Sequence, residues 1–368
     1  MSFQRIVVKL GTSTLTAGTP QISPPRLVDL ARQIAQLHST GRELLVVSSG
    51  AIAAGREGLN FPQLPKDIPA KQMLAAVGQP RLMALYTQLF GLYGLRVAQV
   101  LLTRSDLADR RRYLNSRNTL AALLAQRVVP IINENDTVAT EEIRVGDNDN
   151  LSALVTNLIE ADLLVLLTDQ PGLFTADPRH DPSAQLVAEV SEPDIPAALW
   201  QAAGGTANGL GTGGMLTKLQ AADLARHSGA TVVIAHGDEP DVLSRLVSGE
   251  PVGTRFHPLS TGVESRKRYI LAGRRAAGRM SVDAGALRAL RKGGSLLPVG
   301  VVSVEGEFGR GDTVRIFDPT GREVARGLSN YASSDLARLC GRQSTEIEAV
   351  LGVNFGDEVV HRNNLVML

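Results

Sequence analysis

The chain has 368 residues, of which 43% are hydrophobic and 20% charged, a composition typical of a globular protein of about two domains. Its formal net charge of +1 is too balanced to indicate a nucleic acid, a membrane or an acidic macromolecule as partner of the whole molecule. The single cysteine, Cys340, excludes an internal disulfide and any CxxC metal or redox motif, and is compatible with a reducing compartment.

The amino-terminal residues show no targeting signal. Residues 1–5 lack the charged, apolar and small-residue layout of a signal peptide. The longest purely apolar runs, such as residues 163–167, are far too short to span a bilayer. We therefore expect a cytoplasmic protein without a membrane partner.

Strand and helix patterns alternate over the first two-thirds of the chain. The first expected helix follows Ser23, a candidate N-cap, has Pro24 at its first position and stops near Gly41. Repeated strand–helix–strand units predict an open, mostly parallel sheet sandwiched by helices. The expected strands are 6–8, 44–47, 128–132, 163–167 and 231–234, and the later helices cover 120–124, 151–158 and 216–227.

The pattern changes near residue 250. Residues 249–278 hold prolines, glycines and the basic cluster 266–268, and we interpret them as a linker with room for one strand. Short β-type runs at 299–304, 313–317, 323–326 and 358–361, with helices at 284–291 and 335–339, then predict a small β-rich module. The expected boundaries are a first domain over 1–255, a linker over 256–275 and the module over 276–368.

Five polar clusters follow expected strands or open expected helices. They are residues 9–13, 48–51, 133–136, 146–150 and 209–218. In an open parallel sheet, ligands bind in the crevice at the carboxyl ends of the strands. Five such clusters in one domain therefore indicate one composite site.

Two of the clusters have the character of phosphate sites. Gly11 would let backbone amides approach an anion closely, and Lys9 would supply a positive charge. The glycine-rich turn 209–214 precedes a helix that carries Lys218, although its spacing is not that of a Walker A loop. The alternatives are a solvated lysine at a strand end and a flexible linker.

The other clusters suit a small polar ligand. Asp136 can accept a hydrogen bond from an ammonium group, and Asn133 can donate to a carboxylate. Residues 48–51 would expose amides and hydroxyls at a turn, or form an ordinary N-cap. Residues 146–150 resemble part of a calcium loop but lack its closing acid, so a helix N-cap is the other reading. Residues 168–175 could hold the ribose or base of a nucleotide, or be a Pro–Gly turn.

The sequence lacks the residue patterns that metal-dependent or nucleophilic catalysis would require. The six histidines have no metal-ligand spacing, and no GxSxG nucleophile elbow is present. Cys340 lies away from every cluster, so we interpret it as a buried structural thiol.

Taken together, the segments resemble the amino acid kinase superfamily and, within it, the glutamate 5-kinase family. The resemblance rests on residues 7–13, 48–55, 132–136, 145–153 and 211–215, in this order and spacing. The carboxyl-terminal module resembles a PUA domain, a pseudo-barrel best known from RNA-modifying proteins. Ser48 stands where many relatives have threonine, and residues 204–208 match the family poorly.

The resemblance implies a role for each matching residue. ATP would be bound by Lys9, Gly11, Thr168, Asp169, Thr212, Gly213, Gly214, Met215, Leu216, Thr217 and Lys218, with Mg²⁺ carried on the nucleotide and no metal held by the protein itself. Glutamate would lie against Ser49, Asp136, Asn148 and Asn133. Lys9 and Lys218 would contact the phosphates, and Asp149 would hold the two lysines in place.

The implied activity is ATP-dependent phosphorylation of the side-chain carboxylate of L-glutamate, the first step of proline biosynthesis. The resemblance also implies feedback inhibition by proline, a homo-oligomer (dimer or tetramer), and handover of product to glutamate-5-semialdehyde dehydrogenase. Two alternatives stay open: another carboxylate kinase, for example one acting on N-acetylglutamate, and RNA binding through the carboxyl-terminal module. That module carries 11 basic and 11 acidic residues, whereas an RNA-binding domain usually has a basic excess.

Overall fold

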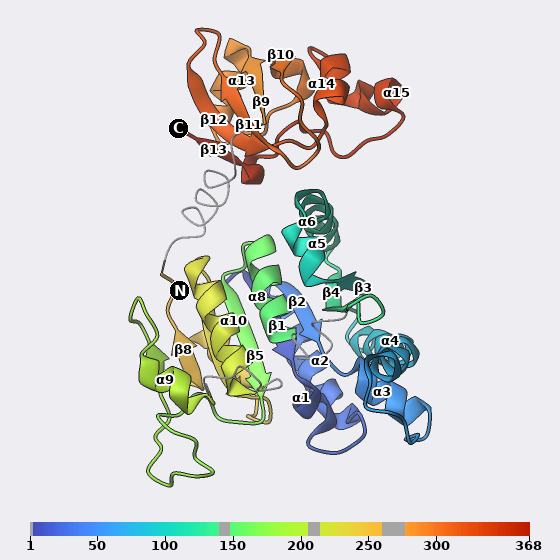
Figure 1. Cartoon of the computed structure of the whole chain (residues 1–368), viewed down its shortest axis with the longest axis vertical. Coiled ribbons are helices and arrows are strands. Elements are labelled where there is room, and N and C mark those ends of the chain that lie inside the picture. The colour runs from blue at the N-terminus through green and yellow to red at the C-terminus, as the bar shows by residue number, and fades with distance from the viewer. Residues whose placement is uncertain (1–2, 140–147, 205–213, 260–276) are drawn as a thin grey trace. The chain divides into compact units, whose positions relative to one another are not determined.

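A computed structural model describes residues 3–139, 148–204, 214–259 and 277–368. The chain divides into two compact units, one of Met1–Leu107 with Arg117–Gly262 and the other of Ala108–Ser116 with Val263–Leu368. Each unit has its own sheet and its own hydrophobic core (Figure 1). Among the described residues, no helix is long and apolar enough to cross a membrane.

The first unit is built on an eight-stranded sheet in the order β3-β4-β2-β1-β5-β7-β8-β6. The strands from β3 to β7 are all parallel, whereas β8 runs antiparallel to β7. This confirms the open, mostly parallel sheet. The strands are β1 (Arg5–Leu10), β2 (Glu43–Ser48), β3 (Val97–Leu102), β4 (Val129–Glu134), β5 (Leu163–Thr168), β6 (Glu189–Val190), β7 (Thr231–His236) and β8 (Thr254–Phe256).

Helices cover both faces of this sheet. Ile6, Val8 and Leu10 of β1 pack into a core shared with helices α2, α4 and α11. Side chains alternate along a strand, so Lys9 lies on the opposite face, where α8 and α10 run side by side (Figure 1). The helices of this part of the chain are α1 (Thr12–Thr16), α2 (Pro24–Ser39), α3 (Ala51–Gly58), α4 (Ile68–Gly91), α5 (Arg104–Ala108), α6 (Arg110–Ala125), α8 (Asn148–Leu158), α9 (Ala197–Ala202), α10 (Met215–His227) and α11 (Val242–Ser248).

Helices α3 and α4 approach each other so closely that two glycines are required. A Cβ atom on Gly55 would lie 1.9 Å from the carbonyl oxygen of Leu74, and one on Gly78 would lie 1.8 Å from that of Ala51. Both distances are far below van der Waals contact. The start of α3, which follows the turn after β2, is therefore held by direct backbone packing against the middle of α4.

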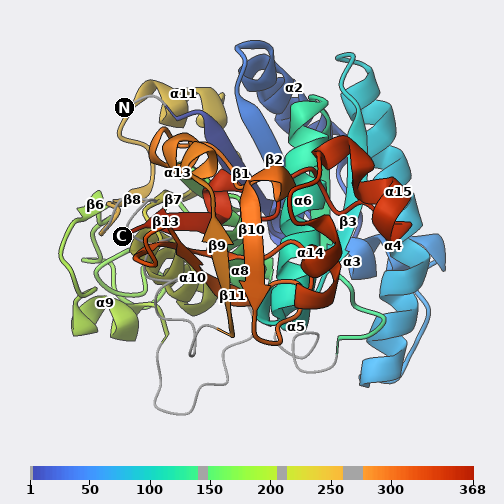
Figure 2. The ribbon, with the colours of Figure 1, turned by 90° about the horizontal axis from the view of Figure 1, so that it is seen from above.

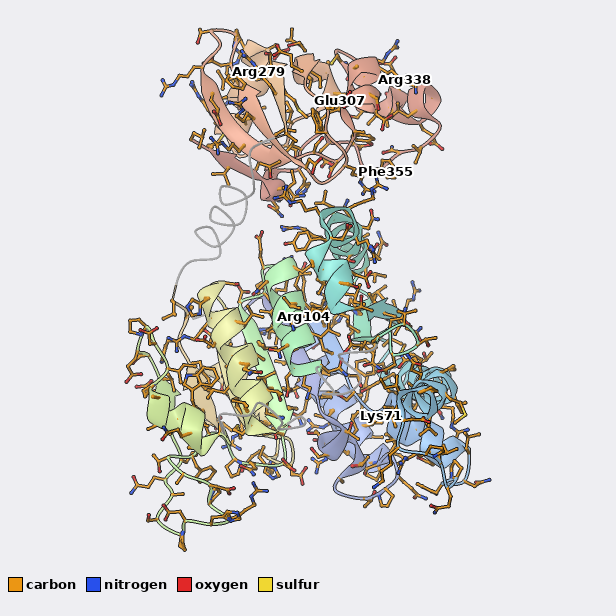
Figure 3. The ribbon with its side chains drawn as sticks, in the orientation of Figure 1. Lys71, Arg104, Arg279, Glu307, Arg338 and Phe355 are labelled. Carbon is orange, nitrogen blue, oxygen red and sulfur yellow. The ribbon has the colours of Figure 1, made fainter. Side chains whose placement is uncertain are left out.

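The second unit is a five-stranded sheet in the order β10-β9-β11-β12-β13 with its own apolar core (Figure 2). The Arg279 guanidinium lies 4.0 Å from the Phe317 ring centre, and the Arg310 guanidinium lies 4.1 Å from that of Phe355. Arg279 and Phe355 are labelled in Figure 3. Its elements are β9 (Gly278–Val282), β10 (Val301–Glu305), β11 (Thr313–Phe317), β12 (Glu323–Leu328), β13 (Leu365–Met367), α13 (Ala284–Arg291), α14 (Ser333–Leu339) and α15 (Ile347–Leu351), with 3-10 turns η1 (Pro298–Gly300), η2 (Ser344–Glu346) and η3 (Arg362–Asn364).

Two sequence-based expectations need correction. The strand expected at 358–361 is wrong, because Val360 forms only an isolated bridge with Leu296 and the last strand is β13. The strands of the first sheet also reach further than their apolar runs. Lys9, Ser48 and Asn133 are therefore strand residues, not the loop residues that follow a strand.

Candidate active site

The order of the strands brings the polar clusters together at one edge of the sheet. Strands β4, β2, β1 and β5 are consecutive neighbours and parallel, so their carboxyl ends form a row. Helices α8 and α10 each lead back to the next strand, β5 and β7, so their amino-terminal ends lie at the same edge. The chain thus gathers strand ends and positive helix ends in one place.

A buried charged centre lies at the middle of this row. The ammonium group of Lys9 on β1 lies 2.6 Å from one carboxylate oxygen of Asp149, and that of Lys218 on α10 lies 3.3 Å from the other. The Thr217 hydroxyl donates to the Lys218-bound oxygen at 2.7 Å. Lys9, Asp149 and Lys218 are 4%, 2% and 7% exposed. Two distant lysines therefore share one shielded carboxylate, which leaves the centre with a net positive charge.

The surroundings shift the pKa values of this centre. Burial alone would raise the pKa of Asp149, but the two ammonium groups and the Thr217 hydroxyl outweigh burial and hold that pKa below its usual value. Burial lowers the pKa of Lys218, the nearby Lys9 lowers it further, and Asp149 opposes both effects only in part. An anion bound at this centre would therefore reduce the electrostatic repulsion between the two ammonium groups.

Gly11 lies directly beside the Lys9 ammonium group. A Cβ atom on Gly11 would lie 3.3 Å from the Lys9 Nζ. A larger residue at position 11 would therefore crowd the ammonium group from the side that the glycine leaves open.

The β2 and β4 ends carry a second network, made of neutral polar groups. Asn148 donates through its amide nitrogen to Ser49 Oγ at 3.0 Å and to Asn133 Oδ1 at 2.9 Å. Asn133 in turn donates to Gln79 Oε1 on α4 at 2.8 Å. Three of the four residues expected to contact the acceptor substrate therefore form one network. Both polar ends of Asn133 are bonded to protein groups, which makes it a support for Asn148.

Two further residues complete this side. Asp136 is half-buried, and burial raises its pKa to about 6. The Ser48 hydroxyl lies 2.7 Å from the Tyr86 hydroxyl on α4, so it faces the helix layer and not the site edge.

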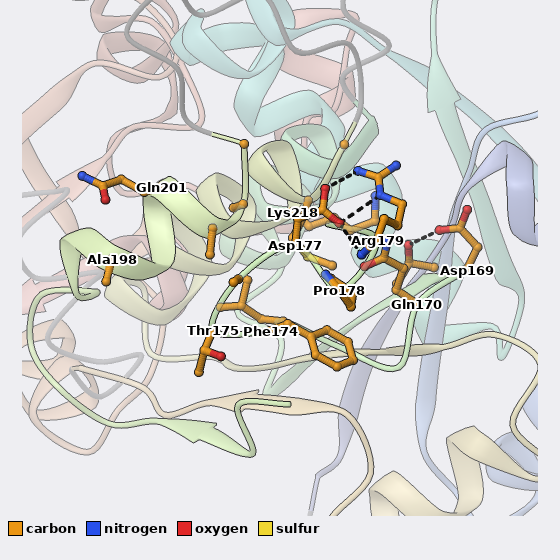
Figure 4. Close-up of a pocket in the computed structure, with 18 of the residues that line it drawn as sticks. Asp169, Gln170, Phe174, Thr175, Asp177, Pro178, Arg179, Ala198, Gln201 and Lys218 are labelled. Carbon is orange, nitrogen blue, oxygen red and sulfur yellow. Dashed lines mark hydrogen bonds and ion pairs between the residues drawn. The ribbon is translucent and has the colours of Figure 1, made fainter. Parts of the chain in front are cut away.

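A pocket of about 700 Å³ opens on the β5 side of the charged centre (Figure 4). Its walls include Thr168, Asp169, Gly214, Met215 and Lys218, which are five of the residues expected to bind the nucleotide. The Thr168 hydroxyl donates to Asp169 at 3.1 Å. The charged centre thus lies between this pocket and the amide network.

Other pocket residues were missed by sequence reasoning. Asp177 and Arg179 form an ion pair at 2.8 Å on the pocket wall, and Gln201 lines it from α9 (Figure 4). No pattern in the sequence links residues 177–179 or α9 to the strand ends. Only the fold of the segment between β5 and α10 brings these residues to the pocket.

Some expected site residues lie outside the described ranges. They are residues 209–213 of the glycine-rich turn, which include Thr212 and Gly213, and Gly146 and Asp147 of the fourth cluster. Residues 205–208, which match the family poorly, also lie outside the described ranges. Leu216 is described and is half-buried in the first turn of α10. Within the described ranges, no group of three histidine, cysteine or acidic side chains could hold a metal ion.

Comparison with known proteins agrees with this geometry. The model of the amino acid kinase family matches residues 4–236, and that of the PUA domain matches residues 278–351. The chain therefore belongs to the amino acid kinase family and carries a PUA domain.

Individual relatives narrow this further. A glutamate 5-kinase of Photobacterium profundum is 57% identical over 99% of this chain and 96% of its own. Glutamate 5-kinases of Shewanella amazonensis and Deinococcus radiodurans are each 56% identical, over 100% and 99% of this chain and 96% and 100% of theirs. Within the amino acid kinase family, the chain belongs to the glutamate 5-kinases.

Proposed function

We propose that the protein transfers the γ-phosphoryl group of ATP to the side-chain carboxylate of L-glutamate, the first step of proline biosynthesis. One observation carries the proposal: Lys9 and Lys218 meet on the two oxygens of Asp149, between a nucleotide-sized pocket and a network of amides. A phosphoryl group in transit between the two sides would lie against both cations. The relatives named glutamate 5-kinase support glutamate as the acceptor.

In the proposed reaction, a carboxylate oxygen of glutamate attacks the γ-phosphorus in line. The new O–P bond forms as the bond to the β,γ-bridging oxygen breaks, which gives L-glutamyl 5-phosphate and ADP. A carboxylate is already ionised at neutral pH, so no general base is needed. Among the described residues that line the pocket there is no histidine.

Catalysis then consists of positioning and charge neutralisation. Lys9 and Lys218 stabilise negative charge on the transferring group, and Asp149 keeps the two ammonium groups at a fixed separation. The amino end of α10 adds backbone N–H donors for phosphate oxygens. Mg²⁺ bound to ATP would neutralise phosphate charge. Asp169 could contact it, because the other nearby carboxylates are paired, Asp149 with the lysines and Asp177 with Arg179.

The test is a hydroxamate assay with ATP, hydroxylamine and either glutamate or N-acetylglutamate. We expect hydroxamate with glutamate only. Hydroxamate from the acetylated substrate alone would reject glutamate as acceptor, and N-acetylglutamate would then take its place.

Lys9→Met and Lys218→Met test the charged centre in the same assay. Each substitution removes one cation from the transition state, so we expect kcat to fall by roughly 100- to 1,000-fold. A fall of less than about fivefold at both positions would contradict the assigned role.

The family resemblance supports four finer proposals. Proline inhibits the enzyme, the protein is a dimer or tetramer, it works in the cytoplasm, where ATP and glutamate are available, and glutamyl phosphate passes to glutamate-5-semialdehyde dehydrogenase. The last follows from chemistry as well, because an acyl phosphate hydrolyses readily in water. Glutamate turnover measured with and without proline tests the first of these proposals.

A further inference from the structure

A chain of hydrogen-bonded side chains links helix α4 to the acceptor side of the site. It runs from Gln79 through Asn133 to Asn148 and ends at Ser49. The three amide side chains belong to residues that are 8%, 2% and 8% exposed, so water cannot readily satisfy them. Each amide must therefore present its nitrogen or its oxygen in the direction that its neighbours require.

One backbone group sets that direction. The N–H of Glu134 lies 2.9 Å from the side-chain oxygen of Asn133. A backbone N–H can only donate, so the Asn133 atom that it faces must be the carbonyl oxygen. The amide nitrogen of Asn133 then points at Gln79, which must present its own carbonyl oxygen.

The orientation of Asn133 in turn fixes that of Asn148, near the other end of the hydrogen-bonded series. Asn148 faces the Asn133 oxygen and Ser49 with its amide nitrogen, so its own carbonyl oxygen is left over. That oxygen is buried and has no hydrogen-bond partner among the described residues. Ser49 accepts from Asn148, which leaves the hydroxyl hydrogen of Ser49 free to donate. The hydrogen-bonded series therefore offers one acceptor, the Asn148 carbonyl oxygen, beside one donor, the Ser49 hydroxyl.

An acceptor beside a donor is what the ammonium and carboxylate groups of an α-amino acid require. We propose that Gln79 is a positioning residue for the amino-acid substrate: together with the Glu134 N–H, it holds the Asn133 amide so that the Asn148 carbonyl stays available to the substrate ammonium group. This inference rests on the proposed function. Without Gln79 the buried Asn133 nitrogen loses its acceptor, and only the Glu134 N–H still favours the present orientation of the Asn133 amide. In the opposite orientation the Asn133 nitrogen would bond to the leftover Asn148 oxygen, at the cost of the Glu134 contact. The acceptor for the substrate would then be used inside the protein.

The packing of α4 places Gln79 with little freedom. Its neighbour Gly78 touches the backbone of α3 at a distance that no side chain could tolerate. Helix α3 itself begins two residues after Ser49. The same helix contact thus positions both ends of the hydrogen-bonded chain.

The experiment compares glutamate with glutarate, which lacks only the amino group. In Gln79→Met, which keeps the size of the side chain without its acceptor, we expect kcat/KM for glutamate to fall roughly 10- to 100-fold, while glutarate changes less than about threefold. The KM for ATP should stay within about twofold. Gln88→Met makes the same substitution at an exposed position of α4 and should leave both substrates unchanged.

Rescue separates hydrogen bonding from folding. Gln79→Glu retains an acceptor oxygen and should keep glutamate turnover within about threefold of the parent. Gln79→Leu replaces Gln79→Met if the latter does not fold. Equal losses for glutamate and glutarate, or no loss in the variant without an acceptor, would overturn the role of Gln79. Absence of glutamate phosphorylation in the parent protein would instead reject the proposed function.

Discussion

At the scale of single residues, the site depends on one carboxylate that keeps two cations together. Asp149 is the second residue of α8, where the positive helix end favours a negative charge. Its two oxygens are occupied by Lys9 and Lys218, and Thr217 orients the second oxygen. A change at this position should therefore act through the protonation of Lys218.

Asp149→Asn tests this idea. The amide keeps the shape but removes the negative charge, so the pKa of Lys218, already lowered by burial and by Lys9, should fall further. Lys218 then loses its proton at a lower pH than in the parent protein, and kcat at saturating glutamate should drop roughly 100-fold. Because acid restores the proton, the kcat of the variant relative to the parent should increase as the pH is lowered. A variant whose loss is independent of pH would show that Asp149 acts in another way.

Asp136 gives a second pH-dependent prediction. Its pKa is raised to about 6 by burial, so the carboxylate is ionised above that pH and protonated below it. If it accepts from the substrate ammonium group, the KM for glutamate should rise about tenfold between pH 7 and pH 5. In Asp136→Asn the KM should be high at both pH values and change little between them. An unchanged pH dependence in this variant would remove Asp136 from the binding site.

The sequence indicated the charged residues of the site better than the residues that hold the substrate-binding side chains in position. Lys9 and Lys218 lie in segments whose composition already suggests phosphate chemistry, whereas the role of Asp149 came from the family resemblance. The fold brings the three residues together. Gln79 gave no such signal, because a glutamine within a helix is usually a solvated residue. Its partner Asn133 is 54 positions away along the chain. Gln79 and Asn133 become neighbours only because α4 packs against the edge of the sheet.

At the scale of elements, apolar runs predicted the central strands well because those strands are buried on both faces. Helix α4 was not predicted, although it is 24 residues long. Pro80 and Gly78 both read as signals that break a helix. The structure explains Gly78 by the close approach of α3, a tertiary cause that local sequence patterns do not contain.

Gly78→Ala tests that explanation. The added methyl group would overlap the carbonyl oxygen of Ala51, so α3 and α4 must move apart. We expect a loss of at least about 2 kcal/mol in unfolding free energy, measured by denaturant titration. Gly91→Ala is the matched control, since Gly91 is in the same helix with open space around its Cβ position and should cost nothing. Equal effects at the two positions would show that helix propensity, and not the helix contact, decides stability.

At the scale of the whole molecule, every proposed catalytic and binding side chain lies in the first unit. The second unit has a core of its own, formed by residues such as Met280, Val314 and Tyr331. Two separate cores need not unfold together, because two-state behaviour is a property of single domains. The chain should therefore respond to a nucleotide in one unit only.

Differential scanning calorimetry of the full chain tests this prediction. We expect two transitions, of which only one shifts upward when a non-hydrolysable ATP analogue is added, since a ligand stabilises the unit that binds it. At an analogue concentration of 100 times Kd, the stabilisation should be about 2.7 kcal/mol. In Lys218→Met the shift should shrink, because the cation facing the phosphates is gone, while the other transition stays in place. A single transition that moves as a whole would show that the two units unfold cooperatively, despite their separate cores.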